Sequence, residues 1–186
     1  NHFSNFTLSF LDLSLLYICL QPFSFSFIIF ITIGWIGVFT FDFSSFKLKD
    51  LKYILLIGIG GSNLGTKAIY DALIGYADNI QEGQKPKIIF IDTNNTLLLK
   101  SVTNLIIDRI DSVDEVLTVT ISKSGGTTET IVNTEIILRE LCDKFGKESV
   151  FNRTVGITSE GSKFDAALQK MGAKLLGGEF LDHVSN

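Results

Sequence analysis

The sequence predicts an α/β protein with a three-layer, doubly wound sheet of five parallel strands, preceded by a hydrophobic segment that does not fit this pattern. Apolar, strand-like runs occur at 53–57, 87–91, 116–121 and 153–157, with a weaker fifth at 173–176. Helix-like stretches separate them near 63–79, 97–107, 128–143 and 161–170. Strands alternating with helical stretches of about 10–15 residues are typical of βαβ units in a parallel sheet.

The predicted topology also indicates where a ligand would bind. Crossovers between parallel strands are right-handed, so the loops that follow the strands gather at one edge of the sheet. Ligands of open α/β sheets bind outside this edge. The loops after Ile57, Ile91, Ile121 and Ile157 all begin there.

Residues 1–46 differ in composition from residues 47–186, which we expect to form the globular domain. Of the 16 phenylalanines, 11 fall in the first segment, whose only charged side chains, with His counted as neutral, are Asp12 and Asp42. We favour a leader that is not native, such as an out-of-frame translation of AT-rich DNA. The uncharged stretch 23–41 is long enough to span a bilayer, and a buried helix pair is a third possibility. A signal peptide is disfavoured, because a basic start and a cleavage site are both missing.

Charge and composition narrow the class of function. The net charge of −4 argues against a nucleic-acid partner. Cys19 and Cys142 are far apart, which fits a reducing, cytoplasmic setting and no disulfide scaffold. His2 and His183 stand alone near the two ends, so we expect no metal site, and we interpret His183 as an ordinary surface or interface residue.

The glycine-rich loop at 58–65 follows the first predicted strand. It is not a dinucleotide fingerprint, because Asn63 replaces the third glycine and Asp92 comes too late for a ribose contact. It is not a nucleotide triphosphate loop either, because Thr66-Lys67 reverses the required order. No nucleotide cofactor is therefore expected.

What this loop does offer is a tight turn into a helix. Gly60 and Gly61 allow a positive φ or a close approach of the backbone to a ligand. Ser62 or Asn63 can cap the helix that follows. A compact turn without a ligand explains these residues equally well.

A second loop of the same kind follows the third predicted strand. Gly125 and Gly126 free its backbone, and a helix is expected to begin near Thr127, with a partial positive charge of about half a unit at its N-terminus. The loop's hydroxyls and single cation are Ser122, Ser124, Thr127, Thr128 and Lys123. Several donors that converge on one group suit a phosphomonoester, and a simple Ser/Thr turn would explain only one of them.

For three further features near this edge, we favour a structural role over a role in binding or catalysis. Glu129 complements the dipole of the helix that begins near Thr127, although it is close enough to orient a water or hydroxyl, which makes it a weak catalytic candidate. Residues 92–95 and 158–162 are both interpreted as turns that end in a helix cap.

The two loops together resemble the signatures of the glucose-6-phosphate isomerase family. Gly58–Gly65 resembles the family's glycine-serine signature, and Ser122–Thr130 resembles its Ser-Lys-Thr-x-Thr-Thr-x-Glu-Thr signature. The resemblance runs from about Leu51 to Leu176 and implies a sugar-isomerase (SIS) domain. It also implies that the sugar phosphate is held by Ser122, Lys123, Ser124 and Thr127, with Gly61 and Ser62 lining the same pocket.

By this resemblance the protein would interconvert glucose 6-phosphate and fructose 6-phosphate, with no cofactor and as a homodimer. Gly177-Gly178-Glu179 has the glycines but not the arginine of the family's Gly-Gly-Arg motif, so we interpret it as a loop before that motif. By the same resemblance, the family's catalytic glutamate, histidine and lysine would come after Asn186. We therefore expect a fragment with the phosphate anchor but no catalytic base. A non-catalytic SIS sensor and an amino-sugar isomerase or synthase of the same fold remain open alternatives.

Overall fold

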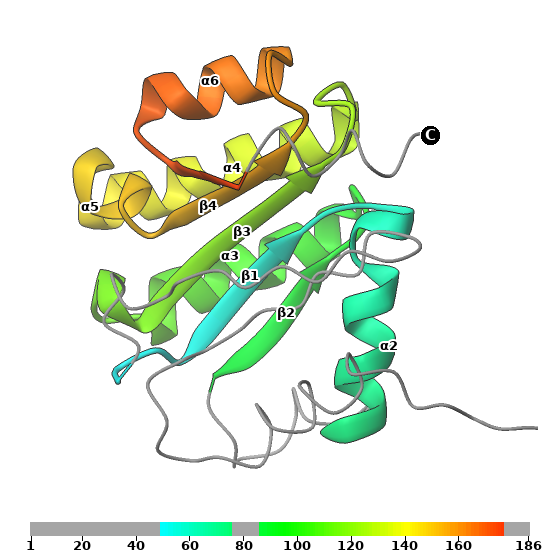
Figure 1. Ribbon diagram of the computed structural model, residues 1–186. Coiled ribbons are helices and arrows are strands. Elements are labelled where there is room, and N and C mark those ends of the chain that lie inside the picture. Colours follow the sequence, from blue (N-terminus) through cyan, green and yellow to red (C-terminus); the bar gives the residue numbers. More distant parts are fainter. Residues whose placement is uncertain (1–48, 76–85, 177–186) are drawn as a thin grey trace, which may run out of the picture.

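The computed structural model describes residues 49–75 and 86–176 and contains the predicted five-stranded parallel sheet (Figure 1). All strand pairs are parallel, and the strand order is β2-β1-β3-β4-β5. The strands are β1 (Tyr53–Ile57), β2 (Lys87–Ile91), β3 (Val116–Ser122), β4 (Thr154–Thr158) and β5 (Lys174–Leu176). The predicted strands are confirmed to within one residue at each end.

The helices between the strands were also anticipated, with two exceptions. The elements are α2 (Leu64–Leu73), α3 (Thr96–Arg109), α4 (Thr128–Phe145), α5 (Lys147–Phe151), α6 (Lys163–Met171) and the 3-10 turns η2 (Gly60–Ser62) and η4 (Val113–Glu115). The expected helix at 63–79 was too long, since α2 ends at Leu73, shortly before Gly75. Helix α5 was missed, because five residues are too few to show a helical period.

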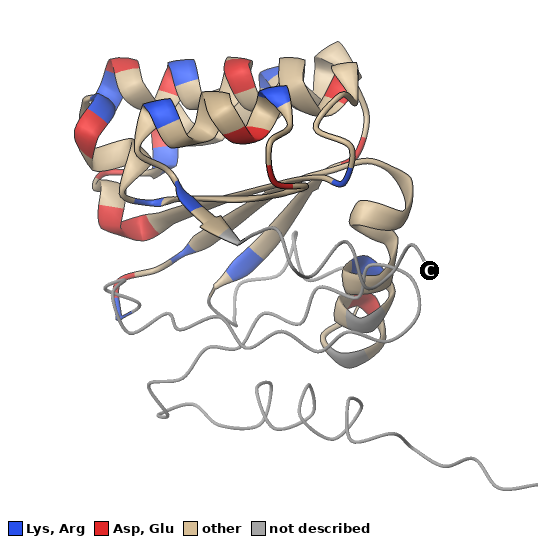
Figure 2. Ribbon diagram, turned by 45° about the horizontal axis from the view of Figure 1, so that its top comes forward, with Lys and Arg blue, Asp and Glu red and all other residues tan. Residues whose placement is uncertain are grey.

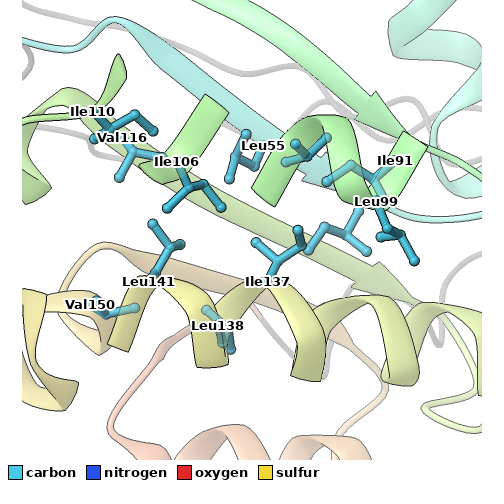
Figure 3. Packing of buried hydrophobic residues seen from close by; sticks show 12 residues of the cluster. Leu55, Ile91, Leu99, Ile106, Ile110, Val116, Ile137, Leu138, Leu141 and Val150 are labelled. Carbon is cyan, nitrogen blue, oxygen red and sulfur yellow. The ribbon is translucent and has the colours of Figure 1, made fainter. Parts of the chain in front are cut away.

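The sheet is covered differently on its two faces. Leu56 and Phe90 face the side where Tyr70 of α2 packs. On the opposite side, β1 and β2 contribute Leu55 and Ile91 to a cluster with α3 and α4, as Figure 3 shows. The helical partners in that cluster are Leu99, Val102, Ile106, Ile137, Leu138 and Leu141. Helices α2 and α3 lie on opposite faces because the crossover through α2 goes from β1 to β2, whereas the crossover through α3 goes in the opposite direction along the sheet, from β2 to β3. Right-handed crossovers in opposite directions place their helices on opposite faces.

Most charged side chains lie on the outside of this framework, although Arg153 and Asp165 are buried. Figure 2 shows Lys and Arg interspersed with Asp and Glu along the helices. Within residues 49–75 and 86–176, no helix is both long and apolar enough to cross a bilayer. The expected leader (1–46), Gly177-Gly178-Glu179 and both histidines lie outside the described residues, so the domain boundary at 46/47 stays a prediction.

One buried cation joins the beginnings of the central strands. Arg153, 6% exposed, donates from Nε to the carbonyl of Val116 (3.1 Å) and from Nη2 to the carbonyl of Asp114 (2.7 Å). Burial lowers the pKa of this guanidinium, and the Asp114 carboxylate opposes the shift. The interaction ties the start of β4 to η4 and β3 at the sheet edge opposite the two loops.

We expect Arg153→Met to lower the free energy of unfolding by about 2–4 kcal/mol, because it leaves two carbonyls without a charged donor. Arg139→Met is the matched control, since Arg139 is exposed on α4. Urea denaturation of both variants checks this. Equal midpoints for the two would contradict the role given to Arg153.

Candidate functional site

The loops after β1 and β3 lie side by side at the C-terminal edge of the sheet. β1 and β3 pair in parallel, with Ile57 opposite Thr120. A Cβ added at Gly58 would lie 3.3 Å from the carbonyl oxygen of Ile121, so the first loop touches the end of β3 directly. The strand order reverses between β1 and β3, which makes this the topological switch point where doubly wound proteins bind ligands.

The β1–α2 loop is held by a hydrogen bond that the sequence did not predict. Asn63, 1% exposed, donates from Nδ2 to the carbonyl of Gly58 at 2.6 Å. The expectation that Ser62 or Asn63 caps α2 was wrong, because Asn63 occupies the N-cap position without a side-chain cap bond. Its amide closes the turn instead. Gly60 has a positive φ of 58°, as anticipated, and Gly61 is exposed beside it.

The β3–α4 loop is an ordered network of hydroxyls and backbone N–H groups. The Ser122 hydroxyl donates to Thr127 Oγ1 at 3.3 Å. The N–H of Gly126 donates to Ser124 Oγ at 3.2 Å. Both Thr127 and Ser124 thus act as acceptors inside the loop, which leaves their own hydroxyl protons for an outside acceptor.

The helices at the switch point differ from those beside it in how they begin. The side chain of Asn95 caps α3, accepting from Leu97 N–H at 2.8 Å, and Ser162 caps α6, accepting from Asp165 N–H at 3.0 Å. Both caps were predicted. Neither α2 nor α4 has a side-chain cap bond, although Thr127 occupies the N-cap position of α4. Two helix N-termini without a side-chain cap bond from their N-cap residues therefore flank the switch point, and N–H groups at such helix ends can bind anions.

The charged side chains at this edge are Lys123 and Glu129. Lys123 is exposed in the β3–α4 loop, and none of the residues that the structure describes pairs with its ammonium group. Glu129 is exposed in the first turn of α4, where it complements the helix dipole. Its catalytic role stays a prediction. In the described part of the chain, no cluster of His, Cys, Asp and Glu could hold a metal ion.

Asn133 is a second buried amide that sequence reasoning missed. It is 0% exposed on α4 and donates from Nδ2 to the carbonyl of Thr93 at 3.0 Å, which ties the β2–α3 loop to α4. Asn133 lies one turn before Ile137 on the buried stripe of α4. A polar residue in such a stripe is a signal that could have revealed it.

Comparison with known proteins now gives the family. The strand order and the two adjacent loops identify the chain as a doubly wound α/β protein. Proteins of this class bind ligands at the carboxyl ends of the strands, at the switch point. The family model described as "Phosphoglucose isomerase" matches residues 37–173, and the chain belongs to this family. The match begins inside the segment 1–46 and leaves the expected boundary undecided.

Curated relatives and solved structures agree with this membership. The chain is 37% identical over 113 residues to glucose-6-phosphate isomerase of Parabacteroides distasonis, covering 58% of this chain and 23% of that protein. The Staphylococcus saprophyticus enzyme is 35% identical over 118 residues, covering 63% and 25%. A solved glucose-6-phosphate isomerase of Chlamydia trachomatis is 28% identical with a TM-score of 0.53, covering 69% and 22%.

A hypothetical protein of Thermus thermophilus shares the fold, with 23% identity and a TM-score of 0.55 over 68% of this chain and 28% of that one. The chain spans about a quarter of the length of these relatives.

We expect Asn63→Ala to lower the free energy of unfolding by about 1–3 kcal/mol, because it leaves the buried carbonyl of Gly58 without its donor. Asn104→Ala, at an exposed position of α3, should change stability by less than about 0.5 kcal/mol. Urea titration of the two variants measures the difference. If Asn63→Ala is as stable as the control, the amide does not hold the loop.

Proposed function

We propose that this chain carries the phosphate-binding part of a glucose-6-phosphate isomerase, an enzyme that interconverts glucose 6-phosphate and fructose 6-phosphate. The observation that carries the proposal is the meeting of two uncapped helix N-termini and a hydroxyl-rich loop at the switch point of the sheet. Membership in the phosphoglucose isomerase family supports the choice of substrate.

In the proposed site, the phosphate lies at the start of α4. The first-turn N–H groups and the hydroxyls of Ser124 and Thr127 donate to it, and Lys123 supplies the positive charge. Ser122 is 1% exposed and acts through its hydrogen bond to Thr127, which directs the Thr127 proton outward. Gly61 and Ser62 line the neighbouring side from the β1–α2 loop.

The phosphate does not react in an aldose–ketose isomerisation. A base moves a proton between two adjacent carbons through an enediol, which requires neither a metal nor a cofactor. Binding energy from the remote phosphate positions the reacting carbons. In this proposal, the described loops bind the phosphate. The groups that transfer the proton lie elsewhere in a larger, dimeric protein.

We expect Lys123→Ala combined with Thr127→Ala to weaken fructose 6-phosphate binding by about 3–5 kcal/mol, because two charge-assisted or hydroxyl donors are lost together. Isothermal titration calorimetry with fructose 6-phosphate and glucose 6-phosphate measures this. Lys100→Ala, on the exposed side of α3, removes the same charge away from the site and should leave the affinity nearly unchanged. An unaltered affinity in the double variant would rule out the assigned anchor.

Activity provides a separate test. We expect residues 1–186 alone to give no turnover in a coupled assay, since loss of a positioned base typically lowers a rate about 10²–10⁴-fold. The product of the whole gene should be active and insensitive to a chelator. Robust turnover by residues 1–186 would show that this chain holds the base. An inactive whole protein that still binds sugar phosphates would support a sensor, and preference for an amino-sugar phosphate would change the substrate.

A further inference from the structure

The β3–α4 loop contains a turn whose central peptide is held in one orientation. Its closing hydrogen bond runs from the N–H of Gly125 to the carbonyl of Ser122, at 3.1 Å. The peptide between Lys123 and Ser124 is therefore the central one of a four-residue turn. The two common turn types differ mainly by a flip of this peptide. If the N–H of this peptide faces the ligand, it attracts an anion; if the carbonyl oxygen does, it repels one.

Ser159, in the β4–α6 loop, holds this peptide in one orientation. Its backbone N–H donates to the carbonyl of Lys123 at 3.0 Å, and its hydroxyl donates to the same oxygen at 2.6 Å. Two donors on one oxygen turn the Lys123 carbonyl towards the β4–α6 loop. In a planar trans peptide the N–H points the opposite way from the carbonyl. The N–H of Ser124 is thus directed away from the β4–α6 loop.

The same loop also blocks the turn from moving inward. Gly125 has a φ of 63°, and a Cβ at this position would overlap Ser162 Oγ and lie 3.1 Å from Thr158 Oγ1. Thr158 and Ser162 are themselves joined by a hydrogen bond of 3.1 Å between their hydroxyls. The turn therefore rests on the β4–α6 loop at two residues, Lys123 and Gly125.

We propose that Ser159 is a positioning residue for the phosphate: it orients the Lys123–Ser124 peptide so that the N–H of Ser124 is presented to the anion. This inference rests on the proposed function and adds to it a residue that does not touch the substrate. The Ser124 N–H has no acceptor among the residues that the structure describes, so it is available to a ligand.

Titration of the chain with fructose 6-phosphate and, separately, with inorganic phosphate tests the proposal. Ser159→Ala should bind both about three- to tenfold more weakly, the loss expected for one hydrogen bond that fixes a binding group. Ser159→Thr keeps the hydroxyl and should bind within about twofold of the unaltered chain. Ser149→Ala, at an exposed position of α5, is the matched control and should bind normally.

The amide resonance of Ser124 gives a second readout, which a purely structural role would not change. It should shift when phosphate is added to the unaltered chain and shift much less in Ser159→Ala, with thermal unfolding showing that both are folded. Equal affinities and equal Ser124 shifts, or a Ser159→Thr variant as weak as Ser159→Ala, would overturn the inference alone. Failure of the unaltered chain to bind either probe would overturn the proposed function and this inference together.

Discussion

The parallel pairing of β1 with β3 is the interaction on which the rest of the site depends. It places the loop after Ile57 next to the loop after Ser122, although the chain between them builds β2 and both flanking helices. The α2 and α4 N-termini then converge from opposite faces of the sheet on the same edge. No single residue creates the site, because its donors come from two loops that only this pairing brings together.

Side chains that are not assigned to the ligand hold three of the loops at this edge in place. Asn63 closes the β1–α2 loop from within, Asn133 ties the β2–α3 loop to α4, and Ser159 supports the β3–α4 turn. Each uses a side chain to satisfy a backbone carbonyl. Because these bonds are made by the chain's own groups, binding at the proposed site would cost little conformational entropy. Such preorganisation would suit the proposed anion site.

Most of the fold was predictable from the sequence, because it depends on local patterns. The apolar runs gave the strands, and the turn residues gave the caps at Asn95 and Ser162. The failures involve contacts between distant segments. Asn63 is a residue type that often caps helices, yet its side-chain amide donates to the carbonyl of Gly58. Ser159 was interpreted as part of an ordinary turn, although its hydroxyl donates to the carbonyl of Lys123 in a distant loop. Such roles follow from tertiary packing, which spacing along the chain does not encode.

The β1–β3 pairing has a consequence for how the protein folds. Tyr53 and Val116, which it joins, are farther apart in the sequence than the partners in any other strand pair of the sheet. Closing such a long loop is entropically costly, and contacts of this kind form slowly. The β1-α2-β2 and β3-α4-β4 units can each form from contacts of shorter range. The edge of the sheet that carries the two loops is completed only when these units pair. We therefore expect newly made chains to complete the proposed anion site late, and an anion bound there would favour the last step of folding by mass action.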